Sequence, residues 1–170
     1  MLTLSLFRHA KSAWDDASLE DFARPLAPRG TQAAPAMAAF IHKAGFKPDL
    51  VLCSAARRTR DTWALMASRL GEPRTVYLQE LYEAGAGTLL ASIRKTKADV
   101  HRLMLIGHNP GLQSLAVNLI GSGDPADIEA ISAKLPTAAF VQIDLDIKTW
   151  RGVKPASGHL VRFMTPKRLS

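Results

Sequence analysis

Short apolar runs alternate along the chain with longer stretches of helical spacing, and this alternation restricts the possible folds more than any other feature. Such runs are typical of strands buried in a sheet, and the longer stretches suit helices that cover it. We expect strands at residues 2–7, 49–53, 75–78, 102–106, 138–145 and 159–164, and helices at residues 30–44, 57–70, 87–97 and 112–120. The pattern predicts an α/β fold, a three-layer α/β/α sandwich with a mainly parallel central sheet, to which the last two strands add an antiparallel element at one edge.

The length of 170 residues suits a single domain, and we expect one domain spanning residues 1–170. The only cysteine, Cys53, lies in an apolar run, which excludes an internal disulfide and predicts a buried thiol. No stretch approaches the roughly 18 apolar residues that span a bilayer, and the apolar start lacks the basic segment of a signal peptide. We therefore expect a cytoplasmic protein with no membrane partner.

The formal net charge of +7 favours anionic partners such as phosphoesters, acidic proteins or nucleic acid. Nucleic-acid binding usually combines a basic stripe with exposed aromatic side chains. Aromatic residues make up only 6% of this sequence and the basic residues are scattered, so we expect no nucleic-acid partner.

Three of the expected strands end in residues that can carry chemistry. The first ends in Arg8-His9, the second in Ser54 followed by Arg57-Arg58, and the fourth in Gly107-His108. Ligands in open α/β sheets bind outside the carboxyl ends of the parallel strands, so residues distant in sequence can meet there in one pocket. Guanidinium groups match phosphate oxygens, and imidazole can act as a nucleophile or a proton donor.

This combination favours phosphoryl transfer without a metal or another cofactor. The sequence has no set of ligands at metal-binding spacing, and it has no glycine-rich loop with the lysine that holds nucleotide phosphates. Backbone amides at the starts of the following helices add positive potential for an anion.

The strand ends resemble the motifs of the histidine phosphatase superfamily. Residues 4–11, L-S-L-F-R-H-A-K, are similar to its Arg-His signature, residues 54–62 to its Ser-x-x-x-Arg-x-x-x-Thr motif, and residues 107–110 to the segment with its second histidine. The spacing of the second motif selects Arg58 and not Arg57. The short length and residues 81–84, 134–137 and 163–167 resemble the SixA-type phosphohistidine phosphatase branch, and this resemblance covers nearly the whole chain.

The resemblance implies a phosphoglycerate mutase-like fold and a role for each motif residue. His9 would attack phosphorus to form a phosphohistidine that water then hydrolyses. Arg8, Arg58 and His108 would hold the phosphate oxygens, where charge accumulates in the transition state. By position alone, His9 and His108 could instead be structural residues at a strand end and in a turn, but three motifs in order favour catalysis.

Other residues are expected to be structural. Ser54 and Thr62 would fix a turn and a helix start, and Ala10 stands where most of the superfamily has glycine, which requires a backbone that avoids φ > 0. The remaining histidines show no motif, and we expect no role for them: His42, His101 and His159.

The general acid is less well defined by the sequence. Relatives that act on alkyl phosphates use a glutamate to protonate the departing oxygen, and the candidates here are Glu80 and Glu83. Glu80 matches the position somewhat better, although both residues could also be solvated loop charges.

The substrate class follows from the leaving group. Imidazole leaving phosphohistidine is less basic than an alkoxide, so it needs less help from an acid. The sequence also has no long insertion that would cover the pocket, which suits a phosphorylated side chain on another protein. We expect a phosphatase for phosphohistidine in a partner protein, with two alternatives: a phosphomonoesterase for a small metabolite or nucleotide, and a non-catalytic phosphate-binding module.

Overall fold

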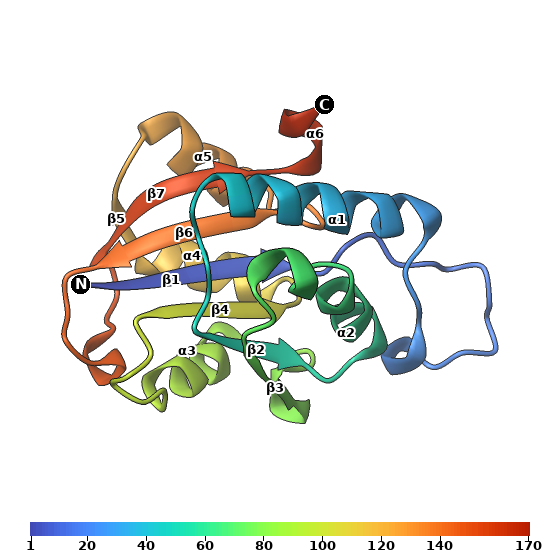
Figure 1. Cartoon of the computed structure of the whole chain (residues 1–170), viewed down its shortest axis with the longest axis horizontal. Coiled ribbons are helices and arrows are strands. Elements are labelled where there is room, and N and C mark those ends of the chain that lie inside the picture. Colours follow the sequence, from blue (N-terminus) through green and yellow to red (C-terminus); the bar gives the residue numbers. More distant parts are fainter.

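A seven-stranded sheet forms the centre of the computed structural model, which describes residues 1–170 (Figure 1). The strands lie in the order β3-β2-β4-β1-β6-β7-β5, and their bounds are β1 (Leu2–Arg8), β2 (Leu50–Ser54), β3 (Arg74–Leu78), β4 (Arg102–Gly107), β5 (Ile120–Ser122), β6 (Phe140–Leu145) and β7 (Gly158–Met164). Neighbouring strands from β3 to β1 pair in parallel, as do β7 and β5, whereas β6 is antiparallel to both β1 and β7. The predicted mainly parallel sheet is confirmed. The antiparallel strand, however, lies inside the sheet, because β7 and β5 extend the sheet beyond it.

Helices cover both faces of the sheet, as predicted. One face carries α1 (Pro28–Lys43) and α2 (Arg57–Ala64), and the other carries α3 (Ala86–Arg94), α4 (Gly111–Leu119) and α5 (Pro125–Ala133). A last short helix, α6 (Pro166–Leu169), ends the chain. Because successive side chains of a strand point to opposite faces, Leu6 of β1 belongs to one buried core and Phe7 to the other. Both cores therefore depend on the same sheet.

Several segments differ from the sequence-based expectation, among them the short elements β5 and α6, which were not predicted. The helix expected at residues 57–70 ends at Ala64 and continues as a short 3₁₀ helix, Ala67–Leu70, which stops at Gly71 with a φ of 84°. Helix α5 was not predicted, because only Ile131 of its residues is buried and its apolar periodicity is weak. Its start signal is nevertheless present, since the side chain of Asp124 accepts a hydrogen bond from the backbone N–H of Ala126.

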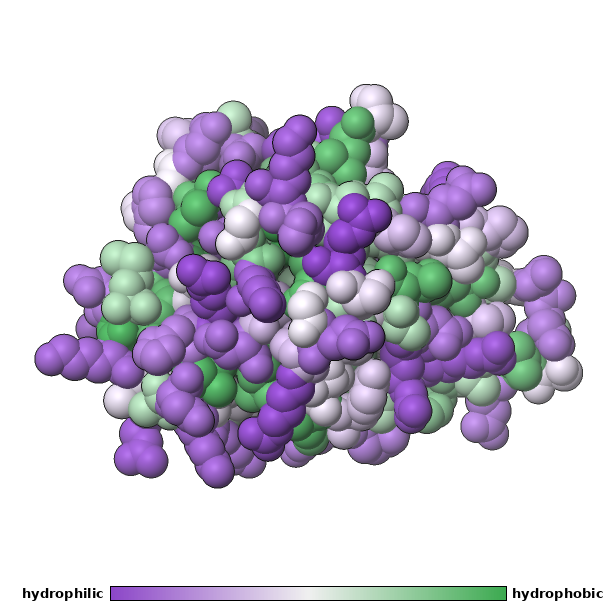
Figure 2. Space-filling view, viewed as in Figure 1, coloured by the Kyte–Doolittle hydropathy of each residue, from purple (hydrophilic) through white to green (hydrophobic).

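The molecular surface in the view of Figure 2 is mainly hydrophilic, and apolar side chains gather there only in small, separate areas. No helix combines the length and the apolar character needed to cross a bilayer.

The register of the sheet brings the chemically important strand ends to one level. Arg8 at the end of β1 pairs with Gly107 at the end of β4, and β4 also pairs with β2, which ends at Ser54. The long segment between β1 and α1, residues 9–27, extends beyond this edge of the sheet at the right of Figure 1. It contains a short 3₁₀ helix, Asp21–Ala23.

Candidate active site

The four residues expected at the strand ends lie together in the structure. Arg8 is the last residue of β1 and His9 follows it, Arg58 lies in the first turn of α2, and His108 follows β4. All four line one cavity of about 250 Å³. The parallel pairing of β1, β4 and β2 thus brings them to the same edge of the sheet, as the topology predicts.

The ring of His9 is held by a single backbone contact. Its Nδ1 lies 2.7 Å from the carbonyl oxygen of Ala10, and because a carbonyl can only accept, Nδ1 carries the hydrogen of the neutral ring. Nε2 therefore keeps an unshared electron pair. Burial lowers the pKa of His9 from 6.5 to about 3, against the opposing effect of the Ala10 contact, and neighbouring basic side chains lower it further. The ring is therefore neutral at pH 7.

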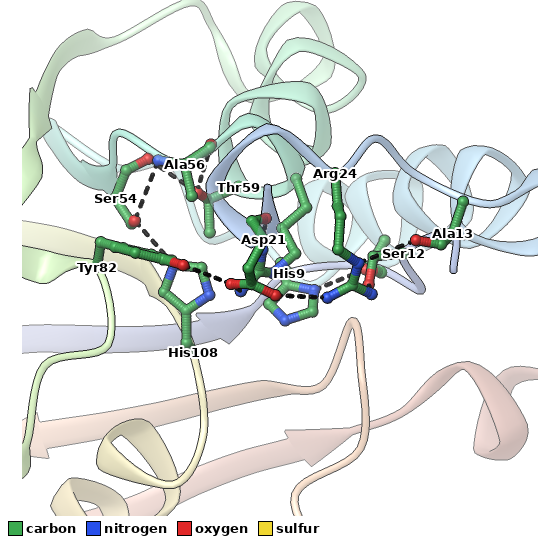
Figure 3. Close-up of polar contacts among 12 residues, drawn as sticks. His9, Ser12, Ala13, Asp21, Arg24, Ser54, Ala56, Thr59, Tyr82 and His108 are labelled. Atoms are coloured by element: carbon green, nitrogen blue, oxygen red, sulfur yellow. Dashed lines mark hydrogen bonds and ion pairs between the residues drawn. The ribbon is translucent and has the colours of Figure 1, made fainter. Parts of the chain in front are cut away.

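The ring of His108 is oriented by Ser54 (Figure 3). The Ser54 hydroxyl lies 2.8 Å from Nε2 of His108, and its oxygen accepts a hydrogen bond from the backbone N–H of Ala56. When the hydroxyl donates to Nε2, both contacts of Ser54 are satisfied and the ring hydrogen of neutral His108 lies on Nδ1.

Nδ1 of His108 is buried and has no hydrogen-bond partner within the protein, so it can donate to an oxygen of a bound anion. Burial, assisted by the charge of Arg58, lowers the pKa of His108 to about 4, which keeps this ring neutral as well. The ring centroids of His9 and His108 are 5.3 Å apart. Ser54 was expected to fix a turn only, and no sequence pattern revealed its contact with His108.

The two guanidinium groups have different partners. Nη1 of Arg8 donates to the carbonyl oxygen of Leu135 at 3.0 Å, whereas its Nε is buried without a partner. Burial and the nearby charge of Arg58 lower the pKa of Arg8. Arg58 is itself buried and donates to the backbone oxygen of Asp21 at 2.8 Å and to Oδ2 of the same residue at 3.0 Å. Two neighbouring cations with unused N–H groups favour the binding of an anion.

Asp21 is a residue of the site that no sequence pattern indicated. Besides Arg58, its carboxylate accepts hydrogen bonds from the hydroxyl of Tyr82 at 2.5 Å and from Nη1 of Arg24 at 2.8 Å (Figure 3). These contacts, led by that of Tyr82, hold the pKa of Asp21 well below its usual range, so the group remains a carboxylate. Burial and the contact with Asp21 raise the pKa of Tyr82 to about 12. Asp21 and Arg24 lie in a polar loop without a motif, so only the folded chain connects them to the site.

Close packing shapes the loop after β1. Oγ1 of Thr62 accepts a hydrogen bond from the backbone N–H of Ala10 at 3.0 Å and donates to the carbonyl oxygen of Arg58 at 2.7 Å. Ala10 does not have a positive φ, which explains why alanine can stand here in place of glycine. A Cβ at Gly30 of α1 would collide with the carbonyl oxygen of Lys11, so α1 packs against this loop only because the residue has no side chain.

The structure separates the two glutamates considered as general acids. Glu80 does not line the cavity of His9, but lines a second cavity beside β2 and β3. Glu83 lines the His9 cavity, and its φ of 53° is uncommon for a residue other than glycine. The preference for Glu80 over Glu83 is therefore corrected on position: Glu80 lies within the 3₁₀ helix Gln79–Leu81, whereas Glu83 follows that helix and lines the cavity. The three histidines without a motif do not line the cavity, and His159 contacts Ser122 instead.

The arrangement can place one tetrahedral oxyanion between cationic and N–H donors and next to an unprotonated ring nitrogen. Such a nitrogen can attack phosphorus, and the donors can hold the oxygens on which negative charge develops. No group of three His, Cys, Asp or Glu side chains is arranged to hold a metal ion.

Residues 4–109 of the chain match the family described as the histidine phosphatase superfamily (branch 1). An uncharacterized protein of Mycobacterium tuberculosis is 36% identical over 162 residues, which make up 94% of this chain and 99% of that protein. The match extends beyond the motifs of the site to nearly the whole chain.

Two solved structures, both provisionally named phosphohistidine phosphatase SixA, are similar to this one. The protein from Agrobacterium tumefaciens is 28% identical with a TM-score of 0.83, and the alignment covers 97% of this chain and 98% of that one. The protein from Nakamurella multipartitia is 26% identical with a TM-score of 0.85, and the coverage is 97% and 96%. These likenesses confirm the predicted α/β/α sandwich of the phosphoglycerate mutase-like type.

Proposed function

The chain belongs to the histidine phosphatase superfamily and is a phosphatase, and from this premise we propose that it removes the phosphoryl group from phosphohistidine in a partner protein. The observation that carries the proposal is the neutral ring of His9, whose Nδ1–H is held by Ala10 so that Nε2 can act as a nucleophile. The similar structures named phosphohistidine phosphatase support the choice of substrate. We also propose that residues 1–170 act as one domain, since both cores share one sheet.

In the first step, Nε2 of His9 attacks phosphorus in line with the bond to the leaving group. A new P–N bond forms to His9, the substrate P–N bond breaks, and the substrate imidazole leaves with the electron pair of that bond. Arg8, Arg58 and the Nδ1–H of His108 hold the oxygens of the transferring group. These residues act electrostatically. Their hydrogen bonds to the phosphoryl oxygens are stronger in the low dielectric of the site than they would be in water.

In the second step, water attacks the phosphorus on His9 and releases inorganic phosphate. The P–N bond breaks and its electron pair returns to Nε2, which regenerates the neutral ring. Covalent capture divides one difficult displacement into two easier ones.

The departing imidazole takes up a proton as it leaves, and we assign Glu83 rather than Glu80 as the donor; the water that attacks in the second step returns a proton to the Glu83 carboxylate. Glu83 lines the cavity, whereas Glu80 lies outside it. Asp21 is unsuitable as a donor, because its contacts stabilise the carboxylate form. Imidazole is a weaker base than an alkoxide, so the reaction depends less on Glu83 than alkyl phosphate hydrolysis would.

The proposal is tested by incubating the protein with phosphoramidate, a labile phosphoryl donor, and isolating the phosphorylated chain. We expect acid-labile, base-stable phosphate on His9 and the loss of turnover in His9→Ala. The matched control is His42→Ala, since His42 is exposed on α1 and does not line the cavity. Full hydrolysis by His9→Ala would exclude the mechanism, and anion binding without turnover in the wild-type protein would identify a phosphate-binding module.

The substrate class is tested by comparing a phosphohistidine peptide with simple alkyl phosphates. We expect a higher kcat/KM for the peptide. A clear preference for alkyl phosphates, with strong dependence on Glu83, would instead support a phosphomonoesterase for small metabolites.

A further inference from the structure

Trp14 is a large aromatic residue whose side chain is mostly exposed to solvent. It is 72% exposed and lines the cavity that contains His9. Burying such a side chain is strongly favourable, so a tryptophan left in water beside a reactive cavity is a candidate contact residue for a partner. Tryptophan is among the residues that contribute most to protein interfaces.

The indole of Trp14 is held in place by Arg24. The guanidinium carbon of Arg24 lies 3.1 Å from the centroid of the ring. Arg24 is buried and donates to the carbonyl oxygen of Ala13 at 3.0 Å, to Oγ of Ser12 at 2.5 Å and to Oδ1 of Asp21 at 2.8 Å. The ring is therefore ordered before any partner binds, which reduces the entropy that binding would cost.

Acidic residues follow Trp14 in the sequence, so the surface around Trp14 carries negative charge, whereas the cavity carries positive charge. Asp15, Asp16 and Glu20 are all exposed, although the chain as a whole carries a net charge of +7. The cavity that Trp14 lines contains the cations of Arg8 and Arg58, and the exposed Lys11 is the one further cation on the segment that leads to Trp14. A polyanion such as nucleic acid would be repelled at this surface, whereas a segment with basic and apolar residues would be attracted.

We infer that the Trp14 rim, defined as Trp14 with the exposed acids Asp15, Asp16 and Glu20, binds the polypeptide segment that surrounds the phosphohistidine of the partner. The inference rests on the proposed function and names the chemistry of the partner: apolar and basic residues flank the phosphorylated histidine. The phosphoryl group enters the cavity of about 250 Å³, and the flanking chain lies across the rim. A small phosphoester would occupy the cavity but would present no flanking chain to the exposed part of Trp14.

The test compares two phosphohistidine peptides, one with leucine and lysine flanks and one with glutamate flanks, and uses phosphoramidate as a substrate without flanks. The readout is the ratio of kcat/KM for each peptide to that for phosphoramidate. In Trp14→Ala this ratio should fall about ten- to thirty-fold for the lysine peptide, the usual effect of losing an interface tryptophan. Trp14→Phe should restore part of it.

Tyr77 provides a matched control. It is 42% exposed and packs against Arg60, whose guanidinium carbon is 4.9 Å from the ring centroid, but it lies on β3 and does not line the cavity. Tyr77→Ala should keep the wild-type ratio. The charge component is tested separately with Asp15→Asn combined with Glu20→Gln, which should reduce the preference for lysine flanks over glutamate flanks and weaken its dependence on salt.

The outcomes distinguish this inference from the proposed function. If Trp14→Ala keeps the wild-type ratio of peptide to phosphoramidate kcat/KM, whether or not both activities fall, the inference alone is overturned. A wild-type protein that hydrolyses phosphoramidate but leaves both peptides intact would overturn the proposed substrate and the inference together.

Discussion

Replacing Ser54 by alanine removes the one hydrogen bond that the structure gives to the ring of His108. The Ser54 hydroxyl is fully buried and lies 2.8 Å from Nε2, while its second contact, from the N–H of Ala56, is longer at 3.3 Å. The substitution leaves Nε2 as a buried acceptor without a partner, and such a group costs about 1–3 kcal/mol. It also removes the constraint that keeps the ring hydrogen on Nδ1.

The expected effect on the reaction follows from the role of Nδ1–H as a donor to the phosphate. The unpaired Nε2 burdens the free protein and the transition state alike, so kcat/KM falls only as far as the Nδ1–H donor loses its orientation; complete loss of one such donor lowers the rate about 100- to 1,000-fold. We expect a fall of about ten- to thirty-fold, because without Ser54 the ring of His108 is still present and can still adopt the donating tautomer part of the time. The melting temperature should fall by about 2–4 °C for each kcal/mol lost.

The assay measures kcat/KM with phosphoramidate, thermal unfolding, and the ¹⁵N chemical shifts of the His108 ring, which report its tautomer. Ser5→Ala is the matched control, because Ser5 on β1 is equally buried but its hydroxyl has no partner. It should keep full activity and equal or greater stability, since removing an unpaired buried hydroxyl is favourable. Wild-type kcat/KM in Ser54→Ala, or an unchanged tautomer, would refute the assignment of Ser54 as the residue that positions His108.

Two further outcomes follow from the electrostatics of the site. Because burial lowers the pKa of His9 to about 3, the nucleophile stays neutral from about pH 8 to pH 5. Therefore kcat/KM, corrected for ionisation of the substrate, should not fall as the pH is lowered through about 6.5, and such a fall would contradict a neutral His9. Asp21→Asn should lower the unfolding free energy at pH 7 by about 1–2 kcal/mol, discounted because the Asp21 side chain is 39% exposed, since the buried Arg58 and Arg24 lose their counter-charge. Folding depresses the pKa of Asp21, so the stability that its carboxylate contributes is complete above the unfolded pKa of about 3.9 and declines as the pH falls below that value. Thermal unfolding at pH 7 and pH 3 should therefore show a smaller stability difference between Asp21→Asn and wild type at pH 3. An equal difference at both pH values would contradict the ion-pair origin.

Local sequence patterns were sufficient for the elements that have strong apolar periodicity or clear ends. Buried runs identified β1, β2 and β4, and the alternation with helices indicated a layered α/β fold. Helix α5 was missed because it packs through few buried side chains, and the sheet position of β6 was misjudged because pairing partners are not encoded in a strand's own composition.

The residue types at the strand ends could be identified before the structure was known. Arg8, His9, the Arg57-Arg58 pair and His108 could be grouped because parallel strands bring their carboxyl ends to one edge whatever the details of packing. The choice of Arg58 over Arg57 came from the resemblance to the Ser-x-x-x-Arg-x-x-x-Thr motif of the family. The way these groups are held became visible only in the folded chain: Ser54 orients His108, Asp21 pairs with Arg58, and Glu83 lines the cavity whereas Glu80 does not. The physical reason is that hydrogen bonds and ion pairs act over a few ångströms and depend on the directions of side chains from distant segments, which local periodicity does not contain.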